Sequence, residues 1–178
     1  MPSFEIEIRD ETARRLEALS RYGSPARVRK SFILPTQDSE VPCALVYFGG
    51  VSMTTDGDAN AGAPSFVHSV RLVVSCLVKA NDPEELELEL DDAANEVLET
   101  LLTDPSWLEL IDSVPQIDRN YKLHDENKRL LMAEARMIFT INYSSDWEPR
   151  VPDRFATGRI RTGDTPGDIN AELNLPQS

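Results

Sequence analysis

The stretch "VHSVRLVVSCLVKANDPEELELELDDAANEVLETLL", residues 67–102, decides the fold because its hydrophobic periodicity changes partway along. Over residues 67–79 apolar and polar side chains alternate with the two-residue period of a β-strand. One face of this strand carries Val70, Leu72, Val74, Cys76 and Val78, and the other is marked by Ser69, Arg71, Ser75 and Lys79. The alternation predicts a half-buried strand with one side on the core.

Residues 81–102 follow the 3.6-residue period of a helix instead. Asp82 is typical of an N-cap, Pro83 suits the first turn, and Glu85 completes a capping-box pattern. The apolar stripe consists of Leu86, Leu90, Ala93, Val97 and Leu101. The sequence therefore predicts an amphipathic helix whose outer face is almost entirely acidic.

Upstream of this stretch the sequence predicts one helix and two strands. An amphipathic pattern over residues 9–21 predicts a helix ending near Gly23, whereas residues 4–8 fit either a short strand or an earlier helix start. Residues 28–34 and 41–48 fit two strands joined by the turn "PTQDSE". Because both faces of the second strand are largely apolar, we expect it to run through the middle of a sheet.

Downstream, "TDPSWLELI" (103–111) begins with a cap and a proline and predicts a short helix or turn. The segments "VPQIDRNYKL" (114–123) and "LLMAEARMIFTINYSS" (130–145) predict two antiparallel strands that turn at "HDENK" (124–128). Beyond Trp147 four of the twelve prolines and three of the eight glycines gather, with few apolar anchors. We expect a domain over 1–147 and an extended arm over 148–178, disordered alone or ordered against a neighbour.

Charge is unevenly distributed along the chain of 178 residues, whose formal net charge is −13. Residues 81–112 contain twelve acids and no base, whereas residues 1–30 carry a balance of +2. An acidic body argues against binding of a nucleic-acid backbone, which depends on Lys and Arg. A basic end beside an acidic middle favours contacts with copies of the chain or with other proteins.

Cys43 and Cys76 both lie in apolar runs, which is typical of free buried thiols. No apolar run approaches the ~18 residues that a membrane span requires. The N-terminus "MPSFEIEIRD" has acids where a signal peptide is basic and then apolar. The sequence predicts a soluble protein that stays in the compartment where it is made.

The segment "TTDGDANAGAP" (54–64) places Asp56, Asp58 and Asn60 at positions 1, 3 and 5 of a calcium loop. Position 6 is Ala61 and position 12 is Val67, so the glycine and the closing glutamate are missing. We interpret the segment as the tip of a β-hairpin, without a metal. A small cytosolic enzyme that uses Asp56 and Asp58 with a divalent metal stays open as an alternative.

The order of these elements, with "VRLVVSCLVKANDPEELE" followed by "AEARMIFTINY", resembles the tail terminator proteins of long-tailed bacteriophages over residues 9–147. The resemblance implies an α+β fold with a mostly antiparallel or mixed sheet, helices on one face, and a hexameric ring. In that family the ring caps the tail tube, ends its polymerisation and provides a surface for head joining. It implies no catalytic residues and no cofactor.

The resemblance also implies partners and a location. The partners are other copies of the chain, the tail tube protein and a head-tail connector or stopper protein, with the genome passing through the ring and no sequence-specific nucleic-acid contact. The protein is then part of the virion and is assembled in the host bacterial cytoplasm. A head-completion or connector protein of the neck is the alternative within the same kind of particle.

We hypothesise that the basic N-terminal region meets the acidic face of a neighbour's 84–99 helix. Reversing the charges of Arg14 and Arg15 would then weaken oligomers, more at low salt than at high salt. The candidate contacts to subunits or partners are Arg14, Arg15, Arg27, Arg29, Asp56, Asp58, Glu87, Glu89, Asp92, Arg150 and Arg154.

Overall fold

The chain divides into two units, Met1–Asp146 and Trp147–Ser178, and each is described by itself. The computed structural model describes residues 3–31, 33, 36–57, 64–124, 131–147, 157–160 and 171–174. In the second unit β6 (Thr157–Ile160) pairs antiparallel with β7 (Ala171–Asn174). The role of the arm after Trp147 stays a prediction.

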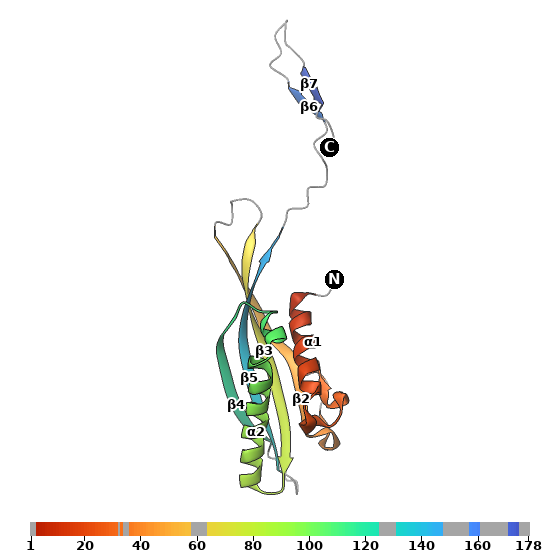
Figure 1. Ribbon diagram of the computed structural model, residues 1–178, viewed down its shortest axis with the longest axis vertical. Coiled ribbons are helices and arrows are strands. Elements are labelled where there is room, and N and C mark those ends of the chain that lie inside the picture. Colours follow the sequence, from red (N-terminus) through yellow and green to blue (C-terminus); the bar gives the residue numbers. More distant parts are fainter. Residues whose placement is uncertain are drawn as a thin grey trace. The chain divides into compact units, whose positions relative to one another are not determined.

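The first unit is built on a mixed sheet with the strand order β1-β2-β3-β5-β4 (Figure 1). Its strands are β1 (Val28–Arg29), β2 (Cys43–Thr55), β3 (Ser65–Ala80), β4 (Ser113–His124) and β5 (Leu131–Asp146). Neighbouring strands are antiparallel except β1 and β2, which are parallel. The predicted α+β fold is confirmed, as are the β2–β3 hairpin and the β4–β5 pair. The "HDENK" turn lies mostly outside the described residues.

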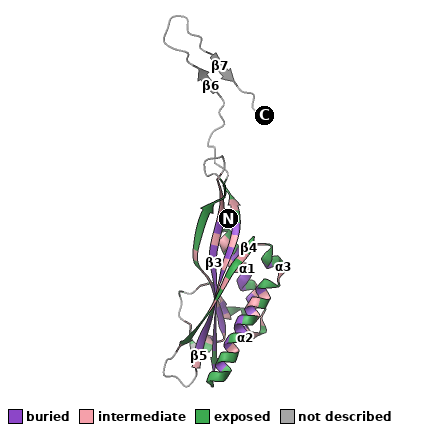
Figure 2. Cartoon of the chain, turned by 90° about the vertical axis from the view of Figure 1, so that its left-hand side faces the viewer, coloured by how far each residue is buried: buried purple, intermediate pink, exposed green. Residues whose placement is uncertain are grey.

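Helices cover one face of this sheet (Figure 2). They are α1 (Phe4–Glu17), α2 (Pro83–Leu102) and the short α3 (Pro105–Leu108). As predicted, α2 begins at Asp82, whose carboxylate accepts hydrogen bonds from the backbone N–H groups of Glu84 and Glu85. Such a cap stabilises a helix by about 1 kcal/mol. Within the described residues, no helix is long and apolar enough to span a membrane.

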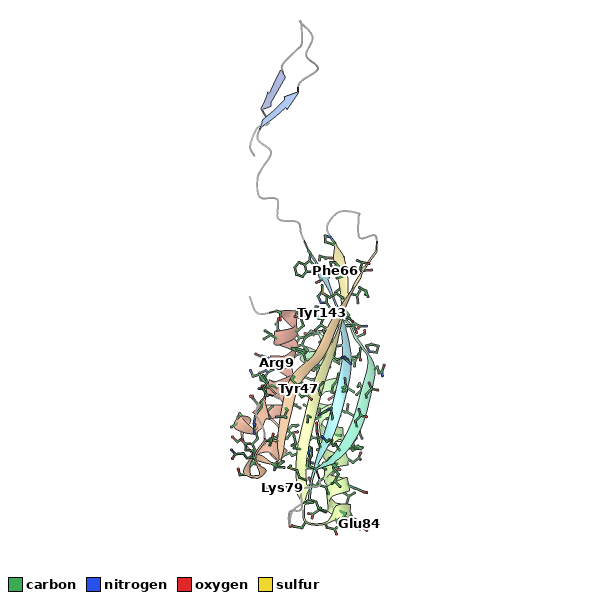
Figure 3. All side chains as sticks on the ribbon, turned by 180° about the vertical axis from the view of Figure 1, so that it is seen from behind. Arg9, Tyr47, Phe66, Lys79, Glu84 and Tyr143 are labelled. Atoms are coloured by element: carbon green, nitrogen blue, oxygen red, sulfur yellow. The ribbon has the colours of Figure 1, made fainter. Side chains whose placement is uncertain are left out.

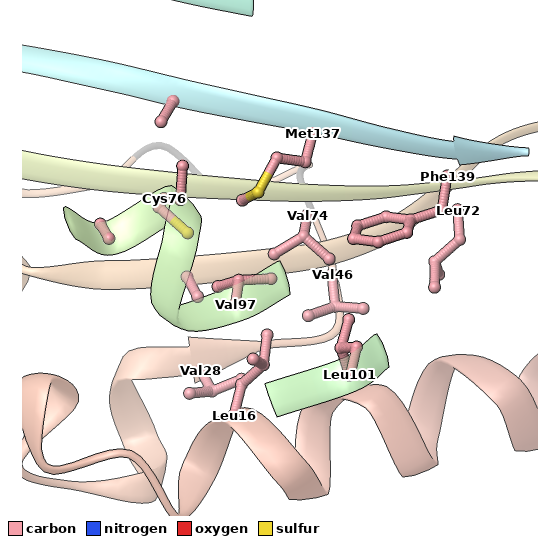
Figure 4. Packing of buried hydrophobic residues seen from close by; sticks show 14 of the residues in the cluster. Leu16, Val28, Val46, Leu72, Val74, Cys76, Val97, Leu101, Met137 and Phe139 are labelled. Atoms are coloured by element: carbon pink, nitrogen blue, oxygen red, sulfur yellow. The ribbon is translucent and has the colours of Figure 1, made fainter. Parts of the chain in front are cut away.

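The core lies between the helices and the sheet, where Val97 and Leu101 of α2 point toward the strands (Figure 4). Every residue of the predicted apolar faces of β3 and α2 is buried. Each such aliphatic side chain stabilises the fold by roughly 1.5–3 kcal/mol relative to exposure. Both cysteines are free and buried, as predicted. Burial raises the pKa of the Cys76 thiol to about 12, and the Tyr22 hydroxyl lies 3.3 Å from its Sγ.

One strand prediction was wrong. Within the described residues, the strand expected over 28–34 covers only Val28–Arg29 and pairs parallel with β2. A parallel pair cannot be joined by a tight turn, and the connection contains a 3₁₀ helix at Asp38–Glu40. The second strand lies between β1 and β3 in the sheet, as predicted, although β1 pairs only with Ala44 and Leu45. Its second apolar face packs in a small separate cluster of Val41, Cys43 and Leu77.

The predicted bounds of the first helix were also shifted. α1 begins at Phe4, so the alternating apolar and acidic residues before residue 9 belong to the helix. It ends at Glu17, and a 3₁₀ turn (Ser20–Tyr22) then carries the chain to Gly23. The φ angle of Gly23 is 64°, a conformation that favours glycine.

The β2–β3 hairpin contains a bulge between Phe48 and Gly50. Phe48 pairs with Leu72 and Val51 pairs with Val70, so both Phe48 and Val51 face the helix side. The bulge adds one residue to β2. Even-numbered residues of β2 therefore face the helices before the bulge, and odd-numbered residues do so after it.

Candidate assembly surfaces

The acidic face of α2 already binds an arginine of its own chain. Arg21, in the 3₁₀ turn after α1, forms ion pairs with Glu89 at 2.5 Å and with Glu96 at 2.8 Å. The side chain of Arg21 is only 18% exposed, so these pairs are shielded from water on one side. Glu89, a candidate contact, is thus engaged within the subunit. The sequence alone does not predict this pairing, because Arg21 and its partners on α2 lie far apart along the chain.

Two other candidate acids on α2 remain available. The side chains of Glu87 and Asp92 are exposed. Neither forms an ion pair within the part of the chain that the structure describes. Asp91, one turn after Glu87, pairs with Arg119 of β4 at 2.8 Å.

The arginines of α1 have partners inside the subunit. Arg14 pairs with Glu11 at 2.5 Å, and its side chain is 60% exposed. Arg15 lies between Glu11 and Asp104, at 2.7 and 2.5 Å. A hydrogen bond from Arg14 holds the pKa of Glu11 below its usual value, despite the opposing effect of partial burial, and Arg15 adds to the lowering. Contacts of Arg14 and Arg15 with a neighbouring subunit stay a prediction.

Arg27 and Arg29 lie two residues apart in sequence but differ in ion pairing. Arg29 of β1 forms an ion pair with Glu40. Arg27 ends a 3₁₀ turn (Pro25–Arg27), is partly buried, and has no ion pair among the described residues. Arg27 is therefore the candidate arginine with its charge left for a partner.

The remaining candidates lie at the hairpin tip and in the arm. The Asp56 backbone N–H donates to the carbonyl of Ser65 at 2.9 Å, closing the described end of the hairpin. Asp58, Arg150 and Arg154 lie outside the described residues. Among the described side chains, no group of three His, Cys, Asp or Glu is arranged to hold a metal ion.

An apolar groove of about 640 Å³ lies between the first half of α2 and the ends of β4 and β5. We call it the α2–β4 groove; it is lined by Leu86, Leu90, Tyr121, Leu123 and Leu131, with Glu87 and Asp91 also lining it. Tyr121 and Leu123 are 51% and 59% exposed. Their register opposite buried Ala135 and Ala133 places them on the helix side, so these are core-type positions that α2 does not cover.

The hairpin carries a second apolar surface. Val51 and Met53, which follow the bulge on β2, are 46% and 45% exposed. At the base of this segment the His68 ring stacks on the Tyr143 ring at 4.4 Å, and the Tyr143 hydroxyl donates to Glu5 at 2.6 Å (Figure 3). These contacts join the start of α1 to β3 and β5. His68 thus takes part in packing the start of α1 against the sheet.

The sheet face away from the helices buries a charged cluster. Glu134 of β5 is 6% exposed and accepts hydrogen bonds from Ser75 Oγ at 2.7 Å and from Arg136 Nε at 2.9 Å. His124 Nε2 lies 3.5 Å from Glu134 Oε2. Burial alone would raise the pKa of Glu134, but the hydrogen bond from Ser75 and the charge of Arg136 outweigh it, so the pKa lies below its usual value.

The fold has a weak likeness to a virion protein chain. No protein-family model matches the sequence, and no curated protein matches it. A chain in the solved structure "Virion of native gene transfer agent (GTA) particle" is similar with a TM-score of 0.35 and 13% identity, covering 74% of this chain and 92% of that chain.

Proposed function

We propose that the chain is a structural virion protein that forms a ring on the end of a bacteriophage tail tube. The ring ends polymerisation of the tube and provides the surface that joins the head. The observation that carries this proposal is the pair of unpaired sheet edges in the first unit.

The two edges belong to different strands. On one side β4 pairs only with β5. On the other, β2 pairs with β3, but from Val46 to Thr55 its opposite edge has no partner among the described strands. Free edges favour pairing with another chain. Because β2 of one copy would meet β4 of the next, the contact is heterologous, and such contacts close into rings when the rotation between subunits fits.

Two further features support a place at a tail tube. The order of elements resembles that of tail terminator proteins, as quoted above for residues 9–147. The β2–β3 hairpin continues past the start of α1 and exposes Val51 and Met53, a small apolar surface suited to a protein partner.

Sedimentation and electron microscopy test this function. We expect a closed oligomer, a hexamer by the family resemblance, and a ring at one end of tail tubes mixed with the protein. Tubes assembled in its presence should stop growing at the capped end. A monomer that leaves tubes uncapped and growing contradicts the proposal. Rings found on heads instead of tubes would favour the alternative neck protein.

A further inference from the structure

The α2–β4 groove and β1 lie at the same level, at opposite edges of the sheet. One row of paired residues crosses all five strands, from Val28 through Ala44, Cys76 and Ala135 to Tyr121. Tyr121 lines the groove, and Val28 belongs to the basic segment 27–33, which we call the Ile33 loop. Figure 1 shows β2, the neighbour of β1, on one side of the sheet and β4 toward the other. A ring whose axis runs along the strands would bring the β1 edge of one copy to the groove of the next.

The apolar chemistry of the two surfaces matches. Ile33 is 78% exposed, the highest exposure among the large apolar side chains that the structure describes. Leu123 in the groove is 59% exposed, and Tyr121 is 51% exposed. Seating Ile33 beside them removes all three side chains from water, which favours association.

Their charges are also complementary. The Ile33 loop contains Arg27, Arg29 and Lys30 and no acid, whereas the groove is lined by two acids of α2, Glu87 and Asp91, against one base of β4, Lys122. Arg29 and Lys30 are already paired within the subunit, the latter with an acid at 3.4 Å, but Arg27 is not. Glu87 at the groove likewise has no ion pair within the described residues. Arg27 on the Ile33 loop and Glu87 at the groove are thus both without an ion pair among the described residues.

We propose that Ile33 of one copy seats in the α2–β4 groove of the next copy, with Arg27 facing Glu87. This contact rests on the proposed ring and identifies one of its interfaces. It also replaces Arg14 and Arg15 with Arg27 as the cation that meets a neighbour's acidic helix.

Cysteine cross-linking tests the contact directly. A full-length chain with both Ile33→Cys and Leu123→Cys should form disulfides between copies under mild oxidation. A denaturing gel should then show a ladder that ends at the ring size. The control combines Leu123→Cys with Met53→Cys, whose side chain is also exposed, at 45%, but lies on the hairpin, and it should run as a monomer on the same gel. No ladder, or equal ladders in both proteins, overturns the contact.

Charge substitutions provide a second test. Ile33→Asp and Glu87→Arg change exposed side chains, so thermal melting should be unchanged while self-association weakens by about tenfold or more, which corresponds to about 1.4 kcal/mol. Combining Arg27→Glu with Glu87→Arg should restore most of the association that either change removes. Unchanged sedimentation of the folded variants would refute the pairing.

The two proposals fail separately. Rings that cap tail tubes but give no ladder refute the Ile33 contact and leave the proposed function standing. A ladder from a protein that never caps tubes supports the contact and refutes the tail function.

Discussion

On the helix side of the sheet Trp107 is fully buried, and on the opposite side Glu134 is nearly as inaccessible at 6% exposure. The Trp107 indole N–H donates to Thr12 at 2.8 Å, and its ring meets the edge of Phe139. Glu134 instead depends on a hydroxyl and a guanidinium for its stabilisation. The helix face is therefore held by packing, whereas the open face combines a small apolar cluster with a buried carboxylate, and the two should respond differently to substitution and to acid.

The largest expected effect is at Trp107. Trp107→Ala removes a buried aromatic ring and should lower the free energy of unfolding by about 3–5 kcal/mol in urea denaturation. Trp107→Phe keeps a ring beside Phe139 but loses the hydrogen bond to Thr12, so it should cost clearly less. Equal losses in the two variants would mean that the hydrogen bond, not the packing, holds this face.

Glu134 comes next. Glu134→Ala leaves the buried Ser75 hydroxyl without its acceptor and should cost about 1–3 kcal/mol in the same measurement. Glu134→Gln retains an acceptor for Ser75 and should lose less stability at pH 7. If the alanine variant is as stable as wild type, charge does not hold the open face.

Low pH should distinguish the contributions of the two faces to stability further. The pKa of Glu134 in the folded protein lies below the value of 4.5 for an unperturbed glutamate. Its charged form therefore stabilises the fold above pH 4.5, and this contribution is lost as the pH falls through the folded pKa. Between pH 7 and pH 3, Glu134→Gln should lose less stability than wild type, whereas Trp107→Phe should follow the wild-type slope.

A smaller effect is expected within the helix layer. Arg21→Ala removes both ion pairs to α2 and should cost about 0.5–1 kcal/mol, because its acidic partners are partly exposed. Arg21→Lys keeps one charge but not two simultaneous pairs, and thermal melting should place it between alanine and wild type. No change in either variant would make the pairs incidental to stability.

The smallest effect is expected at Arg14. Its side chain is 60% exposed, so Arg14→Glu should leave thermal melting close to that of wild type. Sedimentation of this variant at low and high salt then isolates assembly from folding. Weaker oligomers at low salt would place Arg14 at an interface, and unchanged oligomers would exclude it.

Local patterns predicted much of the fold. The alternation in β3 and the cap and stripe of α2 are encoded within each element, and both predictions were confirmed. The parallel pairing of β1 and the short stretch over which β1 covers β2 were not predictable from these patterns. Both depend on where a distant segment lies, and the apolar side chains of a strand do not show how much of its edge a neighbour covers.

The candidate surface residues likewise divide into those that local patterns predict and those that depend on distant parts of the chain. Charge counting along the chain selected Glu87 and Arg27, which the structure leaves without ion pairs among the described residues. It also selected Glu89, whose partner Arg21 is 68 residues away in sequence. Tyr121 and Leu123 escaped notice because exposed and buried apolar residues look alike in a strand. Their exposure follows only from how far α2 extends over β4.

The bulge at Phe48–Gly50 lets β2 tolerate the loss of one residue there, which the rest of the strand does not. Since the bulge absorbs one residue, deleting Gly49 restores regular alternation and leaves Val51 and Met53 on their present side. An insertion between Gly50 and Val51 would instead turn both side chains to the opposite side, and deletion of Ser52 would turn Met53 alone. Which partner surface the hairpin presents is thus set by the number of residues in β2, and no single substitution has the same effect.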